Sequence, residues 1–262
     1  MRETQEKAPG ESGGIKVLDR VLDIIDLLAR AETSLGLSEV THVTGMSKST
    51  VHRLLSALHA RHYVEKRPDN TYRLGIRMLE MASYHINTLE LLTESRPYLN
   101  ALHSALNLTS HLGILEDYQV VYIGLMDSYP HAKLYAQVGK RSPAFCSSMG
   151  KCLLAGLGKE ELDEALRHIT LLAYTAKTIV DPLALRRHLG QVRVQGWAMD
   201  DEEYQAGHRC VGAPVFDYRG DSLAAISVSG ASAQIPEERI AAIVEQVQNT
   251  ARAISRSMGY TG

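Results

Sequence analysis

The sequence predicts an α+β protein made of an N-terminal winged helix-turn-helix, a helical linker and a larger C-terminal α/β domain. Residues 37–75 read as helix, tight turn, helix and two-stranded hairpin, which is the order of a winged helix-turn-helix. After Leu108 the apolar residues change from a helical spacing to the alternation of strands. The chain of 262 residues is also too long for one winged helix, and its length suggests about two domains.

The N-terminal part begins with a tail and an amphipathic helix. Residues 1–14 are charged and rich in Gly, so we expect a disordered tail, and residues 15–75 are assigned to the winged helix-turn-helix. A first helix is predicted over 16–30, and a turn over 33–36 leads to the second. The expected buried face of the first helix comprises Val17, Val21, Ile24, Ile25 and Leu28.

The next two helices are predicted to pack through apolar residues at helical spacing. The second helix begins at Leu37, and Gly45 lies in the turn, where the absence of a Cβ lets the helices approach each other. Ser47 is a suitable N-cap for the third helix. The residues expected to pack between the two helices are Val40, Val43, Met46, Val51, Leu54, Leu55 and Leu58.

The other face of the third helix carries hydrogen-bond donors and positive charge. Between Ser47 and Arg77 there are seven Lys or Arg and two acids, a local net charge of +5 on a chain whose net charge is −2. Such a region suits phosphate and base contacts in a DNA groove, although a small helical unit can also expose basic residues without binding DNA. The expected contacts to double-stranded DNA are Ser38, Ser47, Lys48, Ser49, Thr50, His52, Arg53, Ser56, Arg67 and Arg73.

The hairpin that follows the third helix is predicted to be the wing. Residues 63–66 alternate as a strand, residues 67–70 are typical of a turn, and residues 72–74 form the returning strand.

Beyond Gly75 we expect a linker helix over 76–88 and a second domain over 89–262. A helix is predicted over 89–106, with Pro97 as a kink or a fresh start. Further helices are predicted over 149–157, 159–167, 181–194 and 236–258, the last with Pro236 as its first residue. Strands are predicted at 110–115, 120–125, 133–136, 196–199, 211–216 (interrupted by Pro214) and 223–229.

Two polar segments of the second domain are candidate ligand sites. The segment CSSMGK at 146–151 is a turn leading into a helix, whose free amides favour a carboxylate or phosphate, although an ordinary capped helix explains the same residues. The acids DDEE at 200–203 follow a strand. No His is spaced to join them in a metal site, and a solvated acidic loop is the simpler interpretation. We therefore expect no metal and no cofactor.

A thiol and two hydroxyls add further candidates. Cys210, close to His208, is either an activated nucleophile or, more commonly for a lone Cys in a strand, a small buried residue. Ser227 and Ser229 share one face of a strand while Ile226 packs behind. Buried hydroxyls need partners, which a polar ligand, neighbouring strands or water would supply.

At this point the residues resemble a known family. The winged helix at 16–75, the turn at 148–151 and the stretch DDEEYQAGHRCVGAPVFDYRGDSLAAISVSG at 200–230 together look like the IclR family of bacterial transcriptional regulators. The resemblance implies a GAF-like effector-binding C-terminal domain. It also implies a homodimer or dimer of dimers, paired through the N-terminal domains and the linker helix. Such a protein binds a palindromic operator near catabolic or central-carbon genes and responds to a small organic acid.

The resemblance also implies an effector pocket. A carboxylate such as Asp200 repels an anionic ligand unless it accepts a hydrogen bond from a ligand hydroxyl, which favours an oxo-acid in hydrated form, a hydroxy acid or a sugar acid. The family often has HxTAxGK before the helix, whereas this chain has FCSSMGK at 145–151. Phe145 in place of His, and Met149 in place of a smaller residue, are expected to reshape the pocket. The implied effector residues are Ser148, Met149, Asp200, Cys210, Ser227 and Ser229.

The sequence therefore predicts a ligand-responsive transcriptional regulator, with repression as the expected sign, and not an enzyme. Two alternatives stay open: a Cys-dependent enzyme that uses Cys210 with His208 and Asp200, and an architectural DNA-binding protein without a ligand. Three cysteines in no tight pattern and no signal peptide predict a cytoplasmic protein. No apolar run approaches the roughly 20 residues of a membrane span, so no membrane partner is expected.

Overall fold

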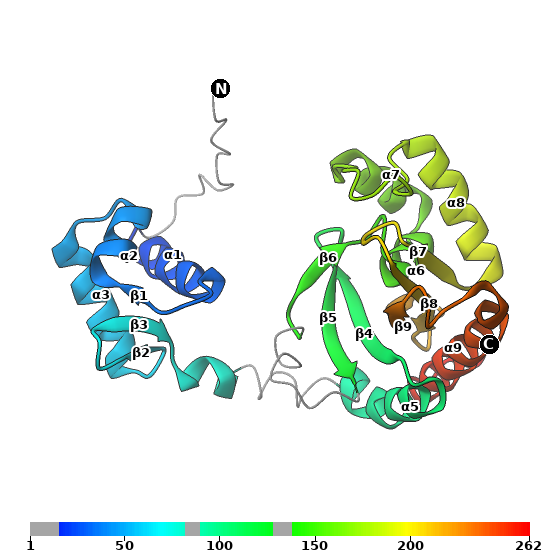
Figure 1. Cartoon of the computed structure of the whole chain (residues 1–262), viewed down its shortest axis with the longest axis horizontal. Helices are drawn as coiled ribbons and strands as arrows, with labels where there is room; N and C mark the ends of the chain where they lie inside the picture. The colour runs from blue at the N-terminus through cyan, green and yellow to red at the C-terminus, as the bar shows by residue number, and fades with distance from the viewer. Residues whose placement is uncertain (1–15, 82–89, 128–137) are drawn as a thin grey trace. The chain divides into compact units, whose positions relative to one another are not determined.

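The structure, a computed structural model, describes residues 16–81, 90–127 and 138–262. The chain divides into two compact units, residues 1–86 and 87–262 (Figure 1).

The N-terminal unit has the predicted winged helix-turn-helix. Strand β1 pairs antiparallel with β3, and β3 pairs with β2, which gives the sheet order β1-β3-β2. The segment 33–36 was predicted to be only a turn, but it contains the short strand β1. The elements are α1 (Lys16–Arg30), β1 (Leu35–Gly36), α2 (Leu37–Thr44), α3 (Lys48–Ala60), β2 (Val64–Lys66) and β3 (Thr71–Leu74).

The core of this unit follows the predicted apolar stripes with two corrections. Val43 is 65% exposed, because the packed side of α2 runs through Leu37 and Val40 and leaves Val43 beyond its edge. Val17 is 50% exposed in the first turn of α1, outside the packed cluster. The fully buried cluster comprises Ile24, Leu28, Val40, Val51, Leu54, Leu55, Leu58, Val64 and Tyr72.

The turn between α2 and α3 depends on backbone conformation. Gly45 has φ +65° and its N–H donates to the Thr41 carbonyl, so it ends α2 in the left-handed region that favours Gly. A Cβ at Gly45 would meet no atom within 4 Å, so the predicted close approach of the helices is wrong. Ser47 caps α3 as predicted, because its Oγ accepts from the Thr50 amide at 3.3 Å.

The predicted linker is described only in part. Residues 76–81 are helical. The remainder of the predicted linker, the predicted tail over 1–14 and the predicted strand over 133–136 lie outside the described residues.

The C-terminal unit is built around one antiparallel sheet with the order β6-β5-β4-β9-β8-β7. Its strands are β4 (Thr109–Glu116), β5 (Gln119–Met126), β6 (Arg141–Pro143), β7 (Ala198–Asp201), β8 (His208–Phe216) and β9 (Ser222–Ala231). Its helices are α5 (Glu90–Leu106), α6 (Ser148–Gly156), α7 (Lys159–His168), α8 (Pro182–Gln195) and α9 (Glu237–Ser257).

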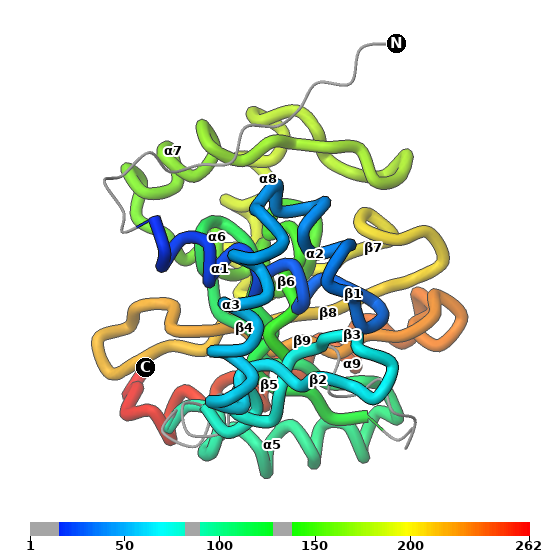
Figure 2. The backbone as a smooth tube through the Cα atoms, turned by 90° about the vertical axis from the view of Figure 1, so that its left-hand side faces the viewer, coloured from blue at the N-terminus to red at the C-terminus, as the bar shows by residue number. Residues whose placement is uncertain are grey.

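The helices cover both faces of this sheet. Helices α5 and α9 lie on one face and α6, α7 and α8 on the other, as Figures 1 and 2 show. Two apolar clusters result, one on each side of the sheet. The predicted mixed α+β fold is therefore confirmed.

Several boundaries differ from the predictions. Strand β7 begins at Ala198 because Gly196 ends α8 with φ +72°, and it continues to Asp201. Strand β6 was not predicted. Pro214 does not interrupt β8, because β7 pairs with β8 only as far as Gly212 and the ladder beyond is one-sided.

Pro97 lies inside a helix, whereas Pro236 lies just before one. Pro97 lies inside one continuous helix, α5, so a fresh start is excluded. Pro236 was predicted to be the first residue of the last helix, but it is the N-cap, and α9 begins one residue later, at Glu237. In the described parts of the chain, every helix is too short or too polar to cross a membrane.

Candidate functional site

The first candidate surface is the outer face of α3. Lys48, His52, Arg53 and Ser56 are exposed on it, opposite the buried apolar stripe. Their side chains are exposed and can reach phosphates or base edges. Their role in DNA contact stays a prediction.

The serine and threonine hydroxyls at the start of α3 are partly engaged. Ser47 Oγ lies 3.1 Å from Ser49 Oγ and 2.8 Å from Thr50 Oγ1. Thr50 is also half-buried. Ser47 and Thr50 therefore hold the helix start, and of the three only Ser49 is an exposed helical residue.

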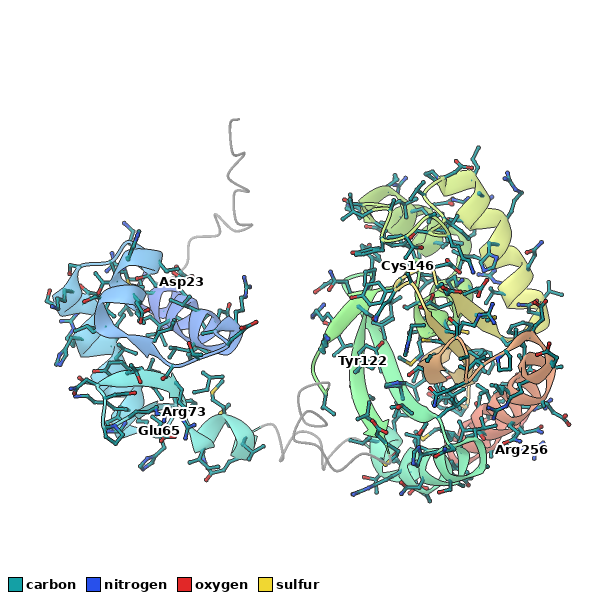
Figure 3. All side chains as sticks on the ribbon, viewed as in Figure 1. Asp23, Glu65, Arg73, Tyr122, Cys146 and Arg256 are labelled. Carbon is teal, nitrogen blue, oxygen red and sulfur yellow. The ribbon has the colours of Figure 1, made fainter. Side chains whose placement is uncertain are left out.

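The wing residues differ in availability. Arg73 Nε donates to Glu65 Oε2 at 3.0 Å across the hairpin, and Figure 3 shows the two side chains together. Such an exposed ion pair is weak, so a phosphate can compete for Arg73. Arg67 is exposed in the turn between β2 and β3, and Ser38 is exposed in the first turn of α2.

The second candidate site is a cavity of about 290 Å³ in the C-terminal unit, which we call the inner cavity. All six residues predicted for effector binding line it. They are Ser148, Met149, Asp200, Cys210, Ser227 and Ser229.

Strand register brings these residues together. Asp200 pairs with Cys210, and Cys210 pairs with Ser229, so the three lie side by side across β7, β8 and β9. Ser227 lies two residues before Ser229 on β9, so the two side chains share one face of the strand. One face of three neighbouring strands therefore forms the floor of the inner cavity.

The start of α6 closes the cavity from above this floor. Ser147 Oγ donates to the Pro143 carbonyl and accepts no hydrogen bond from the first amides of α6, which begins at Ser148. A Cβ at Gly212 would lie 3.2 Å from the Met149 amide nitrogen. Gly212 thus permits the close approach that brings the first turn of α6 to the sheet. Amides at such a helix start favour an anion.

Asp200 is buried, which corrects the predicted solvated acidic loop. It is 3% exposed, and its Oδ1 accepts from the Glu203 amide at 2.8 Å and the Tyr204 amide at 3.3 Å. Burial raises the pKa of Asp200 to about 6, while these amides act in the opposite direction. The side chain is therefore half protonated near pH 6 and mostly ionised at pH 7.

Glu203 is also buried, against a cation from α6. Lys151 Nζ, with no exposed surface, donates to Glu203 Oε1, and Thr178 Oγ1 donates to the Glu203 carbonyl at 2.6 Å. This ion pair joins α6 to the turn that follows Asp200. It therefore fixes both walls of the inner cavity relative to each other.

Sequence reasoning missed His111. Its Nε2 lies 2.9 Å from Ser229 Oγ, and burial lowers its pKa to about 4, so the ring is neutral. His111 Nδ1 is buried without a hydrogen-bond partner among the described residues. Its role depends on the pairing of β4 with β9, which joins residues 118 positions apart, and no local pattern signals that pairing.

The remaining lining residues add charge and further rings, among them Tyr122 and Tyr204. Lys140 and Arg141 supply cations, whereas Asp127 is acidic. Tyr122 packs edge-on against His111 with ring centroids 5.3 Å apart, and Figure 3 labels Tyr122 on β5. The cavity is therefore polar, with two cations at the start of β6.

Cys210 lacks the properties of a nucleophile. Burial, with Asp200 nearby, raises the pKa of its thiol well above 9, so the thiol is protonated. His208 has a pKa lowered by burial. Among the residues that the structure describes, no group of His, Cys, Asp and Glu is arranged to hold a metal ion.

Both parts of the chain match models of known protein domains. The IclR helix-turn-helix domain matches residues 17–68, and the bacterial transcriptional regulator IclR C-terminal domain matches residues 84–256. The transcriptional regulator XynR of Escherichia coli is 33% identical over 94% of this chain and 98% of its own length. BhcR of Paracoccus denitrificans is 35% identical over 95% of this chain and 89% of its own.

A solved structure supports the same assignment. The crystal structure of Thermotoga maritima IclR has a TM-score of 0.80 and 27% identity, and the match covers 94% of this chain and all of that one. The relatives are transcriptional regulators and not enzymes. The protein therefore belongs to the IclR family of bacterial transcriptional regulators.

Proposed function

We propose that this protein binds an operator in double-stranded DNA through residues 15–75, and that a small carboxylate-containing effector, bound by residues 89–262, alters that binding. The exposed basic face of α3 enters the major groove, and the wing contacts the adjacent backbone. The observation that carries the proposal is the convergence of six polar or helix-start residues on one cavity.

The geometry of the inner cavity favours a hydroxylated acid. The ligand carboxylate lies at the amides of Ser148 and Met149, where the helix dipole is positive. A second carboxylate at Asp200 repels this group unless Asp200 accepts from a ligand hydroxyl. Hydroxy acids, hydrated oxo-acids and sugar acids meet this requirement.

We further propose a homodimer or a dimer of dimers. Val17, Leu18 and Leu22 of α1 are about half exposed, as are Ile76 and Leu79 of the following helical segment. Two apolar stripes of this kind on a small unit support pairing with a second copy. A twofold dimer would read a palindrome with half-sites about one helical turn, ~34 Å, or a multiple of it apart.

The effector acts only if it binds the DNA-competent state and the other state with different affinities. We propose that effector binding shifts the linker and so the spacing of the two recognition helices. Repression is the proposed sign, since one relative, the transcriptional repressor IclR of Escherichia coli, is 28% identical over 95% of this chain. Catabolic or central-carbon genes are the proposed targets, and the cytoplasm is the proposed location.

Fluorescence anisotropy with a promoter fragment from the neighbouring genes tests this function. The wild-type protein should prefer that fragment to random duplex at moderate salt, and a set of hydroxy acids and sugar acids should change the affinity. Arg53→Ala should reduce affinity and lower the salt slope by about one if it contacts phosphate. Arg256→Ala, an exposed Arg of α9, is the matched control and should change neither.

A second variant separates the two sites. Ser229→Leu should leave promoter binding intact and abolish the response to the acid, because a larger side chain fills the inner cavity floor. Promoter binding equal to that of random duplex in the wild type would contradict the proposed function.

A further inference from the structure

A second cavity adjoins the inner cavity. This outer cavity, of about 470 Å³, lies between the β4–β5 turn, strand β6 and the segment after α7. Arg141, Ser142 and Tyr204 line both cavities, so the two share a wall. Arg141 and Tyr204 are exposed side chains, and exposed side chains change rotamer rapidly. The third shared residue, Ser142, is buried on β6, and Arg141 Nη1 donates to the Glu116 carbonyl at 3.1 Å. A ligand that spans both cavities therefore passes beside β6 and has to displace the Arg141 and Tyr204 side chains.

The outer cavity is rich in aromatic rings. Four of its fourteen lining residues are Phe or Tyr, whereas aromatic residues make up 6% of the chain. Tyr118 stacks on His168 with ring centroids 5.8 Å apart. The ring centroid of Tyr174 lies 6.2 Å from that of Phe145 and 5.1 Å from that of Tyr204, which it contacts edge-on.

Two of these rings still have open surface. Tyr174 is 45% exposed and Tyr204 is 37% exposed, although each contacts another ring. Aromatic side chains that remain open in a cavity offer apolar contact area at a small entropic cost. The outer cavity is therefore suited to a ligand with a flat apolar face.

Polar side chains surround the same rings. Asp117, Gln119, Arg141 and Thr170 line the outer cavity together with the aromatic residues. Arg141 already contacts Asp117 and donates to the Glu116 carbonyl, but a purely aromatic ligand would cover Gln119 and Thr170 without giving their side chains partners. A sugar ring has apolar C–H faces and hydroxyls around its edge, so it matches both kinds of lining residue.

We propose that the effector is a glycosylated sugar acid, whose acidic end occupies the inner cavity and whose sugar ring occupies the outer cavity. This inference rests on the effector role proposed for the inner cavity. The carboxylate lies at the start of α6, the open-chain hydroxyls lie near Asp200, and the sugar ring packs on Tyr174. Arg141 and Tyr204 stand beside the linkage between the two halves.

Isothermal titration calorimetry on the full-length protein tests the inference with two matched acids. D-gluconate is the short acid, and lactobionate is the same acid with a galactosyl ring attached. Lactobionate should bind about tenfold more tightly, since ring contacts of this kind are worth about that factor. Tyr174→Ala should remove this advantage and leave gluconate affinity unchanged, because Tyr174 lines only the outer cavity.

Control variants keep the result interpretable. Tyr218→Ala removes another exposed Tyr, outside both cavities, and should change neither affinity. Circular dichroism checks that Tyr174→Ala is folded. Tyr118→Ala, in the other group of rings, provides a second variant for which the same loss of advantage is expected.

Three results would overturn the inference. The first is equal or tighter binding of gluconate by the wild type. The second is an equal loss of both acids in Tyr174→Ala and Tyr118→Ala. The third is that neither acid binds at millimolar concentration. Promoter preference measured on the same protein stays independent of all three, so the failure of this inference is distinguishable from failure of the proposed function.

Discussion

The two faces of the six-stranded sheet differ in chemistry although the same strands form both. On the face toward α5 and α9, β9 contributes Ala224, Ile226 and Val228 to a continuous apolar cluster. On the opposite face the same strand contributes Ser227 and Ser229 to the inner cavity. The difference follows from the alternation of side chains along a strand.

The comparison separates stability from binding. Apolar burial on the α5–α9 face stabilises the fold in proportion to area. On the cavity face, polar groups are buried at a cost that specific partners offset, such as the Glu203 amide for Asp200 and Ser229 for His111. Substitutions on the first face should change the free energy of unfolding. On the second face, which also carries an apolar cluster, substitutions of the residues that line the inner cavity should instead change ligand affinity.

The Lys151–Glu203 ion pair lies on the cavity side of the sheet, yet its loss should produce the largest change in stability. Lys151→Met leaves the carboxylate of Glu203 buried without its cation, and breaking such a pair costs about 3–5 kcal/mol. Chemical denaturation measures the loss. The double variant Lys151→Met/Glu203→Leu should recover most of it, because no buried charge remains. A single-variant loss below about 1 kcal/mol would mean that water reaches the pair.

The α5–α9 face should give the next largest change in the free energy of unfolding. Ile226→Ala removes a fully buried side chain from the α5–α9 cluster and should cost about 2–5 kcal/mol by thermal or chemical unfolding. Effector affinity, measured at a temperature where the variant is folded, should stay unchanged. A matching loss of affinity would show that the two faces are coupled through the sheet.

The protonation of Asp200 on the cavity face should make ligand affinity depend on pH. Its folded pKa of about 6 lies above the ordinary 3.8, so the stability that its proton contributes is lost as pH rises through about 6. An acid without hydroxyls, such as hexanoate, requires protonated Asp200. Its affinity should therefore fall by up to about tenfold per pH unit between pH 6 and 8. Gluconate, whose hydroxyl can donate to ionised Asp200, should show a weaker dependence.

Asp200→Asn provides the control for this comparison. The slope for hexanoate should disappear, apart from any contribution of His111 and His208, whose pKa values burial lowers. The same pH dependence for both acids in the wild type would contradict hydroxyl recognition by Asp200.

The sequence is informative where one element decides the outcome. The cap at Ser47 and the stripe from Val51 to Leu58 depend on neighbours within about two turns, and both predictions are confirmed. Val43 fails because its exposure depends on which side of α2 meets α3. Strand β6 was missed because three residues ending in Pro143 carry no alternation.

Predicting the inner cavity requires knowing which strands pair, and these strands are far apart in the sequence. Asp200 was interpreted as part of a solvated loop, yet it is buried because it pairs with Cys210 and caps the turn at Glu203. His111 gave no signal, because its partner Ser229 is reached only through β4–β9 pairing. The resemblance to a family, and not the spacing of residues, supplied the six lining residues as a set.

Ser227→Ala should have the smallest effect on stability and gives the most direct comparison with its neighbour Ile226. The hydroxyl faces the cavity, so its loss leaves no void in packed core, and the free energy of unfolding should change by less than about 0.5 kcal/mol. Loss of one hydrogen bond to the effector should reduce affinity by about 1 kcal/mol, or roughly fivefold, by calorimetry. If instead stability falls as much as in Ile226→Ala, Ser227 is a packing residue and the cavity face is part of the core. Adjacent residues with opposite consequences would place the boundary between folding and binding within a single strand, at the alternation of its side chains.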